Sequence, residues 1–221
     1  MIELLNVDCM AYMATLPDNA FDIAIVDPPY GIGEANEKRM LSRHHTQAKY
    51  HAGAWDADSP PVEYFNELIR VSKNQIIWGA NHFISKIPYD SSCWIFWDKD
   101  GHGDFADGEL AWTSFKTAVR KIKYTWNGFR KQHPENRIHP TQKPKMLYQW
   151  LYKNYCQPGW KILDTHLGSG SSAIAAYHMG FDFVGCEIDK DYFDQMQARY
   201  NRETDEGMFA GIHSDKLVIN Q

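Results

Sequence analysis

The sequence predicts an α/β protein with a doubly wound, mostly parallel sheet. Strand-like and helix-like segments alternate along most of its 221 residues, as they do when crossover helices connect parallel strands. The run at 21–26 is almost continuously apolar and β-branched, which is typical of a strand buried on both faces. The chain has 43% hydrophobic and 23% charged residues, the composition of a globular protein, and we expect a single domain over residues 1–221.

Each expected element rests on its hydrophobic periodicity or on a turn signal beside it. The helix at 8–16, for example, has Met10, Met13 and Ala14 at helical spacing and ends before the turn at Pro17. In chain order, strands are expected at 2–7, 21–26, 75–78, 94–97, 110–115, 119–126, 161–163 and 183–186. Helices are expected at 8–16, 61–71, 81–85, 143–155, 171–179 and 192–200.

The four cysteines disfavour both a zinc site and a disulfide framework. Cys9, Cys93, Cys156 and Cys186 lie far apart, and no pair has CxxC spacing. The sequence shows no signal peptide. Its apolar runs are much shorter than the roughly 20 residues that a membrane span needs. We therefore expect a cytoplasmic protein with reduced thiols, no metal and no membrane partner.

The charge distribution suggests a nucleic-acid partner, although the net charge of -5 at first argues against one. Residues 116–145 hold nine of the 23 lysines and arginines but only one of the 28 acids, so this segment is +8 and the remainder -13. Such segregation suits a basic stripe on an acidic body, although a solvated basic hairpin is the plain alternative. The candidate DNA-binding residues are Lys116, Arg120, Lys121, Lys123, Arg130, Lys131 and Arg137.

A glycine-rich turn is the first candidate ligand site. The segment 164–170, Asp-Thr-His-Leu-Gly-Ser-Gly, lies between an expected strand and an expected helix. Glycine lets the backbone turn sharply and approach a ligand, and the helix start offers free N–H groups. Glu187 follows Gly168 by 19 residues, a spacing at which an acid can bind ribose hydroxyls. The turn predicts a nucleotide-type ligand without choosing among nucleotides, and a glycine-rich turn with no ligand is the alternative.

A second candidate site, Asp27-Pro28-Pro29-Tyr30, follows the buried strand at 21–26. It is expected at the carboxyl edge of the sheet, where open α/β sheets bind ligands. The Asp27 carboxylate and the Pro28 carbonyl could accept the two N–H groups of an aromatic amine and make its nitrogen more nucleophilic. Pro28 and Pro29 stiffen the turn, and Tyr30 offers a flat face to a base turned out of a helix. The alternative is a stiff turn with a buried tyrosine.

Together these elements resemble the β-class amino-group DNA methyltransferases, and more narrowly the small adenine-specific enzymes of phages and prophages. The resemblance covers nearly the whole chain, in the order catalytic turn, basic segment and glycine-rich turn. The segment 139–144, His-Pro-Thr-Gln-Lys-Pro, is similar to the family's His-Pro-Thr-x-Lys-Pro element. The resemblance implies a Rossmann-like S-adenosylmethionine-dependent fold, a small DNA-recognition insertion at 100–138, and direct methyl transfer to the exocyclic amine of a flipped adenine.

The resemblance also implies roles for individual residues. Asp8 would approach the cofactor adenine, Glu187 would bind the ribose, and Thr141 and Lys143 would hold the methionine carboxylate. The usual Asp-Pro-Phe before the glycines is Asp-Thr-His here, so His166 is expected as a polar wall of the pocket. The catalytic residues would be Asp27, Pro28, Pro29 and Tyr30. The cofactor-binding residues would be Asp8, Asp27, His139, Thr141, Lys143, Asp164, His166, Gly168, Ser169, Gly170 and Glu187.

Three alternatives stay open at the level of sequence. Methylation of the cytosine amine would use the same cofactor half, although Asp27 in place of serine favours adenine by resemblance. A nicotinamide-dependent oxidoreductase would explain the glycine-rich turn and Glu187 but not the segment 27–30. A non-catalytic DNA-binding module would bind duplex without transfer. The recognition segment is short for one subunit to read many bases. The expected partner is DNA; the sequence leaves the oligomeric state open, a homodimer included.

Overall fold

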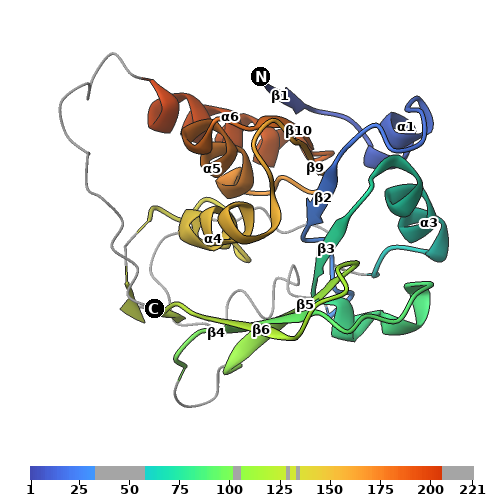
Figure 1. The fold of residues 1–221 in the computed structure, drawn as a ribbon. Coiled ribbons are helices and arrows are strands. Elements are labelled where there is room, and N and C mark those ends of the chain that lie inside the picture. The colour runs from blue at the N-terminus through green and yellow to red at the C-terminus, as the bar shows by residue number, and fades with distance from the viewer. Residues whose placement is uncertain (33–57, 102–105, 128–129, 133–134, 206–221) are drawn as a thin grey trace.

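One eight-stranded sheet forms the centre of the protein (Figure 1). The computed structural model describes residues 1–32, 58–101, 106–127, 130–132 and 135–205. The strand order is β1-β10-β9-β2-β3-β5-β4-β6, and within this sheet β5 alone runs against its neighbours. The predicted mostly parallel α/β fold is confirmed. The strands are β1 (Ile2–Leu5), β2 (Ile23–Val26), β3 (Gln75–Trp78), β4 (Trp94–Asp98), β5 (Gly108–Thr113), β6 (Arg120–Lys123), β9 (Lys161–Asp164) and β10 (Asp182–Cys186).

Helices cover both faces of the sheet (Figure 1). On one face lie α4 (Lys145–Tyr155), α5 (Ser171–Met179) and α6 (Lys190–Thr204), and on the other lie α1 (Cys9–Ala14) and α3 (Val62–Val71). The expected short helix at 81–85 is instead two 3₁₀ turns, η1 (Ala80–His82) and η2 (Ile84–Lys86). None of the described helices is long and apolar enough to cross a bilayer.

Alternation along the central strands separates two apolar cores. In β2, which is fully buried, Ile23 and Ile25 pack in the core beneath α4 and α5, whereas Ala24 and Val26 pack in the core beneath α1 and α3. Because helices cover both faces of the sheet, both alternating sets of side chains in β2 are apolar, as the continuous apolar run predicts. Two helices begin at capping aspartates: the Asp8 side chain accepts a hydrogen bond from the Ala11 N–H of α1, and Asp189 caps α6.

The segment 100–138, expected as a recognition insertion, is divided between the sheet and a separate ribbon. Its residues supply β5 and β6 to the main sheet. The expected strand at 119–126 divides after Lys123, and β7 (Trp126–Asn127) pairs with β8 (Arg130–Lys131) in a two-stranded antiparallel ribbon. The part of this segment that lies outside the main sheet is therefore smaller than the sequence suggested, and its role in target recognition stays a prediction.

The direction of winding reverses between β9 and β2, which are neighbours in the sheet. The chain leaves β9 through α5 and continues to β10 on one side. It leaves β2 and reaches β3 on the other side through α3, which covers the opposite face. Such a reversal opens a crevice at the carboxyl ends of the two strands, the usual ligand position in open α/β sheets. The two candidate ligand turns of the sequence follow these two strands.

A buried arginine connects the glycine-rich turn to the segment that precedes α4. Arg199 in α6 has only 1% of its side chain exposed. Its guanidinium donates to the carbonyl of Ser169 at 2.9 Å and forms ion pairs with Glu135 at 2.6 Å and Glu203 at 2.8 Å. A buried cation with this many acceptors is compensated. Removal of Arg199 would take the guanidinium away from Glu135 and from the Ser169 carbonyl, whereas Glu203 would keep its ion pair with Lys145.

Arg199→Ala is therefore expected to lower the free energy of unfolding by about 3–5 kcal/mol, the range for breaking a buried ion pair. Urea denaturation at neutral pH measures this. Arg202→Ala is the matched control because Arg202 lies on the same helix but is exposed, and it should change the stability by less than about 0.5 kcal/mol. Equal losses in the two variants would contradict this account of Arg199.

Candidate active site

The carboxyl ends of four parallel strands bring the sequence-predicted site residues to one edge of the sheet. Among the predicted residues, Asp27 follows β2, Asp164 ends β9 and Glu187 follows β10; Gly79, which the sequence did not single out, follows β3 at the same edge. The antiparallel β5 begins at this same edge, because its Ala111 pairs with Trp78 at the end of β3. Residues from five strands therefore meet at this edge, and four of the strands bring side chains to it.

A buried cluster of charges surrounds Asp27. The Lys143 ammonium lies 2.5 Å from Asp27 Oδ1 and 3.0 Å from Glu109 Oε2, and only 4% of its side chain is exposed. The Tyr30 hydroxyl donates to Asp27 Oδ1 at 2.8 Å and accepts from Lys143 at 3.1 Å. Glu109 is also paired with Lys99, which follows β4. Asp27 Oδ1 thus has two partners, while Oδ2 makes no hydrogen bond within the described residues.

Burial and neighbouring charges set the protonation of this cluster. Burial raises the pKa of Asp27; Lys143 opposes that rise and Glu109 adds to it. Burial also acts to raise the pKa of Glu109, but Lys143 and Lys99 outweigh it and bring that pKa to about 2. The pKa of Lys143 is raised, because the two carboxylates outweigh the effect of its burial. Glu109 and Lys143 are therefore both charged at neutral pH.

The ring of Tyr30 is packed on one face. It stacks on His82 with ring centroids 5.0 Å apart and an interplanar angle of 16°. A Cβ atom at Gly79 would lie 2.0 Å from the nearest atom of this ring, and Gly79 has a φ of +68°. The ring and the hydroxyl are therefore both held in place. The predicted stacking of a target base on Tyr30 stays a prediction, and it concerns the face away from His82.

The glycine-rich turn is held by two acids. Asp164 Oδ2 accepts from the Ser172 hydroxyl at 2.6 Å and Oδ1 accepts from the backbone N–H of His166 at 3.0 Å. Glu187 accepts from the N–H of Gly168 at 2.9 Å. Burial raises the pKa of Asp164 to about 7. Within the described structure Asp164 forms no ion pair, so no positive charge opposes the rise in its pKa that burial causes.

The predicted His-Pro-Thr-x-Lys-Pro element joins the two ligand turns. His139 faces Gly168, at which a Cβ atom would lie 3.8 Å from the imidazole, and its ring packs 4.5 Å from that of Tyr192. The Thr141 hydroxyl lies 3.1 Å from His139 Nδ1. Lys143, four residues after His139, reaches Asp27 instead of the glycine-rich turn. Its predicted contact with a methionine carboxylate stays a prediction, and in the structure this ammonium already has two carboxylate partners.

Two imidazoles in the crevice are neutral at physiological pH. Burial lowers the pKa of His166 to about 4, and burial together with Lys143 lowers that of His139 to about 4. His166 Nδ1 lies 2.9 Å from the Thr165 hydroxyl, and its ring contacts Tyr64 edge-on at 5.4 Å. A neutral ring held in this way suits the polar wall expected of His166. Asp8 is exposed and caps α1.

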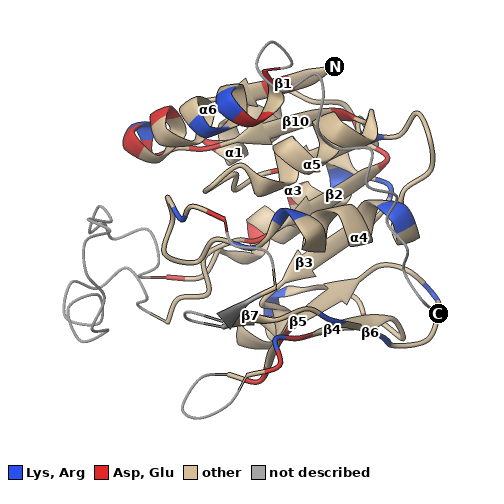
Figure 2. Ribbon diagram, turned by 90° about the vertical axis from the view of Figure 1, so that its left-hand side faces the viewer, with Lys and Arg blue, Asp and Glu red and all other residues tan. Residues whose placement is uncertain are grey.

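The predicted DNA-binding residues do not form one stripe. Lys116 and Arg120 precede or begin β6, at the edge opposite Asp27, whereas Lys123 ends β6 at the edge of Asp27. Lys121 is paired with Asp98 at 2.7 Å and Lys123 with Asp100 at 2.8 Å. Figure 2 likewise shows basic residues on α6 as well as on β6. Arg137 lies over the Trp126 ring at 5.6 Å, and the side chains of Arg130 and Lys131 are outside the described residues.

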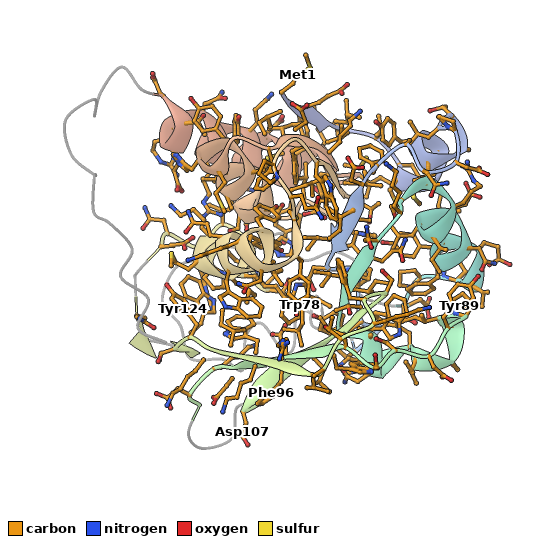
Figure 3. The ribbon with its side chains drawn as sticks, viewed as in Figure 1. Met1, Trp78, Tyr89, Phe96, Asp107 and Tyr124 are labelled. Atoms are coloured by element: carbon orange, nitrogen blue, oxygen red, sulfur yellow. The ribbon has the colours of Figure 1, made fainter. Side chains whose placement is uncertain are left out.

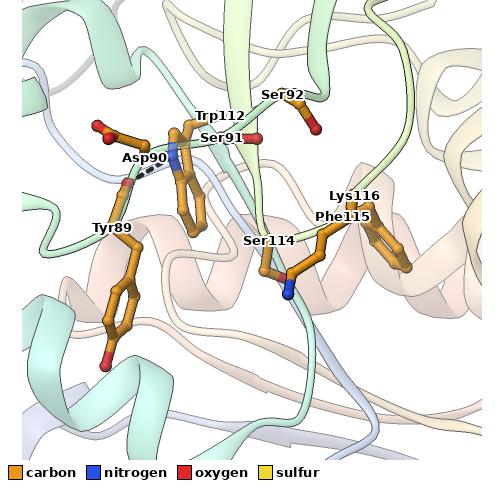
Figure 4. A pocket seen from close by; sticks show the side chains of 8 residues that line it. All are labelled: Tyr89, Asp90, Ser91, Ser92, Trp112, Ser114, Phe115 and Lys116. Carbon is orange, nitrogen blue, oxygen red and sulfur yellow. Dashed lines mark hydrogen bonds between the residues drawn. The ribbon is translucent and has the colours of Figure 1, made fainter.

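A hollow of about 390 Å³ lies at the opposite edge of the sheet and is separate from this site. Trp112 and Ser114 at the end of β5 line it, and the Trp112 indole donates to the carbonyl of Tyr89 at 3.1 Å (Figure 4). Figure 3 shows the two places apart: Tyr89, beside the hollow, lies at one side of the molecule, and Trp78 lies in the interior beside α4. Trp78 marks the candidate active site, because the Lys143 ammonium lies 5.5 Å from the centroid of its ring. Among the described residues, no group of three or more potential metal ligands is found.

Sequence reasoning missed Glu109, Lys99 and the role of the Tyr30 hydroxyl. Glu109 lies in the fragment Gly108-Glu109-Leu110, which carries no motif. The only signal that could have found it is strand direction, because the beginning of an antiparallel strand lies at the edge where parallel strands end.

Comparisons with known proteins identify what the chain is similar to. A family model described as DNA methylase matches residues 112–198. Over 224 residues the chain is 25% identical to "Putative methylase YubD" of Escherichia coli (strain K12), and the match covers 90% of each protein. The predicted resemblance to the amino-group DNA methyltransferases is confirmed. The narrower resemblance to phage and prophage enzymes stays a prediction.

Two solved structures share the fold. The M1.HpyAVI–SAM complex has a TM-score of 0.57 and 21% identity, and the match covers 90% of this chain and all of that one. The PvuII DNA methyltransferase, described as cytosine-N4-specific, has a TM-score of 0.58 and 10% identity over 92% of this chain and 93% of that one. Of these two structures, one is described as cytosine-N4-specific and the name of the other gives no target base, so the shared fold does not choose between adenine and cytosine.

Gly79→Ala is expected to destabilise the protein by displacing Tyr30. Gly159→Ala is the matched control, because Gly159 has a φ of +83° and no atom would lie within 4 Å of its Cβ. Both variants acquire the strain of a positive φ, about 1–2 kcal/mol, but only Gly79→Ala adds overpacking of about 1–3 kcal/mol. Urea denaturation should therefore show a larger loss for Gly79→Ala. The same loss in both variants would mean that the Tyr30 ring is not tightly held.

Proposed function

We propose that the protein is an S-adenosylmethionine-dependent DNA methyltransferase that methylates the exocyclic amine of adenine. The observation that carries the proposal is the state of Asp27. Its Oδ1 atom is held by Tyr30 and Lys143, its Oδ2 atom has no partner within the described structure, and it lies where the winding of the sheet reverses. A carboxylate oxygen kept open beside a ligand crevice can accept an N–H group of a substrate amine.

The residues of the glycine-rich turn fit the proposed cofactor. Asp164 is a buried carboxylate that has no ion-pair partner in the described structure, so a cationic group of a ligand would stabilise its ionised form. A Cβ at Gly168 would meet nothing closer than 3.8 Å, which leaves room beside the turn. Glu187 lies at the carboxyl end of β10, next to Gly168, in the position expected for binding ribose hydroxyls.

The chemistry requires positioning more than acid–base catalysis. S-adenosylmethionine, when bound, supplies a methyl group already activated on a sulfonium. The chain has to hold the amine nitrogen in line with that methyl group. Asp27 and the Pro28 carbonyl would accept the two amine N–H groups and stabilise the positive charge that develops on the nitrogen. Asp27 or solvent then receives the proton that leaves the methylated amine.

The choice of adenine rests on the resemblance of the segment 27–30 to the adenine-specific enzymes, and methylation of the cytosine amine is the second candidate. Incubation of the protein with labelled S-adenosylmethionine and unmethylated genomic DNA tests both. Mass spectrometry of the digested nucleosides should detect N6-methyladenine. Detection of N4-methylcytosine instead would replace the adenine proposal, and no label in DNA would remove the whole proposal.

Asp27→Ala should leave DNA affinity nearly unchanged and lower kcat at saturating S-adenosylmethionine by about 100- to 1000-fold, the cost of losing one preorganised polar partner at a reacting atom. Single-turnover transfer to an oligonucleotide measures this. Asp22→Ala is the control, because Asp22 precedes the same strand at the opposite edge of the sheet, where it pairs with Lys73. Transfer by Asp27→Ala at more than a tenth of the wild-type rate would argue against the catalytic role.

The affinity for S-adenosylmethionine should depend on pH through Asp164. Since a cationic ligand favours the ionised carboxylate, whose pKa is about 7 before binding, the affinity should rise between about pH 6 and pH 8 and level off above that range. His139 and His166, with pKa values of about 4, do not titrate there. Calorimetry in buffers of different ionisation enthalpy should detect proton release near neutral pH. Asp164→Asn should bind more weakly and lose that release; release that persists would assign it to another group.

The salt dependence of DNA binding should distinguish the two edges of the sheet. Each phosphate contact contributes about -0.9 to the slope of log affinity against log salt concentration. Replacing Lys121 and Lys123 by alanine should therefore flatten the slope by roughly one to two. Lys116 lies before β6 and Arg120 is its first residue, so both lie away from the edge of Asp27. Replacing these two by alanine removes the same number of charges and should leave the slope unchanged. Equal effects would mean that DNA reaches both edges.

A further inference from the structure

The charge cluster around Asp27 contains more groups than the proposed transfer step uses. It consists of two carboxylates, Asp27 and Glu109, and two ammonium groups, Lys143 and Lys99, so its formal charge is balanced. Glu109 and Asp27 are both acceptors, so Glu109 forms no hydrogen bond with Asp27 itself. What it does contact are the two groups that hold Asp27, namely the Lys143 ammonium and, at 3.3 Å, the Tyr30 hydroxyl.

The donors of Lys143 are fully used in this arrangement. A lysine ammonium has three N–H donors and no acceptor. In the structure these serve Asp27 Oδ1, Glu109 Oε2 and the Tyr30 hydroxyl oxygen. No donor is left to turn toward Asp27 Oδ2, the oxygen that the proposed function reserves for the substrate amine.

We propose that Glu109 is a positioning residue for methyl transfer: by holding one donor of Lys143, it keeps Asp27 Oδ2 open to the target amine and limits how far Lys143 neutralises Asp27. This inference rests on the proposed function. Without the negative charge of Glu109, an amide oxygen at this position would hold the Lys143 ammonium more weakly, and the positive charge of Lys143 would act on Asp27 alone. The ammonium would then compete with the amine for the same carboxylate and weaken it as an acceptor.

The effect on titration has opposite signs for the two partners of the cluster. The charged and titratable groups around Asp27 come from several elements. Lys143 and His139 lie in the segment before α4, Tyr148 lies within α4, and Tyr30 lies in the same turn as Asp27. Glu109 lies in β5 and Asp164 in β9. Among these groups Glu109 raises the pKa of Asp27 and Lys143 lowers it. Glu109→Gln should lower the pKa of Asp27, and Lys143→Met should raise it. A loss of packing alone would not produce shifts in opposite directions.

The test combines kinetics with direct titration of Asp27. For Glu109→Gln we expect kcat to fall by about 10- to 100-fold. This is the range found when a group that orients a metal ligand is removed, which is a similar positioning role. The affinities for S-adenosylmethionine and DNA should stay within about twofold of wild type. The acid limb of the kcat–pH profile should move to lower pH. In Lys143→Met it should move to higher pH. Glu67→Gln, which removes a carboxylate from a distant ion pair with Arg70, should change neither kcat nor the limb.

Carbon-13 NMR of labelled aspartate and glutamate carboxylates, with the Asp27 resonance assigned by its loss in Asp27→Asn, gives the pKa of Asp27 whether or not transfer occurs. If wild-type protein methylates no DNA, the proposed function fails, yet opposite shifts of Asp27 in the two variants would still support the arrangement of charges. Unchanged titration of Asp27 in both variants overturns the inference. So does a wild-type kcat in Glu109→Gln when the wild-type protein is active.

Discussion

The pairing of β2 with β9 is the constraint on which the candidate site depends. These two strands end side by side, and the chain leaves them in opposite directions around the sheet. The reversal keeps both connecting helices away from the strand ends and leaves a crevice there. Asp27 and Asp164, which are 137 positions apart in the chain, therefore lie on neighbouring strands at the same edge. Neither turn would form a joint site if another strand lay between them.

The buried charges around Asp27 are better explained by function than by stability. Removing ions from water costs several kcal/mol for each ion, and well-packed apolar residues often stabilise a core as much or more. In this protein the charges are balanced and nearly every donor has an acceptor, so the cost is largely offset. What the arrangement provides is a carboxylate with one oxygen fixed and the other open. An apolar core could not present such a group to a substrate.

The basic segment shows how strand geometry redistributes charge. In the sequence, Arg120, Lys121 and Lys123 are nearly consecutive, and they predict one continuous surface. A strand rises about 3.3 Å per residue, so Arg120 and Lys123 lie roughly 10 Å apart at opposite ends of β6. Ion pairs with Asp98 and Asp100 reduce the local charge further. A count of charges along the chain therefore overstates the positive surface available at the crevice.

The sequence by itself determined the fold class, most strands and helices, and the two ligand turns, because these follow from local periodicity, glycine and proline chemistry, and apolar runs such as 21–26. Only the tertiary structure showed that Lys143 contacts Asp27, that Glu109 completes the cluster, and that Lys116 lies at the far edge. The reason is physical. Strand order and direction arise from contacts between distant segments, and the reversed direction of β5, which no local pattern in Gly108-Glu109-Leu110 records, is what brings Glu109 to the edge where the parallel strands end.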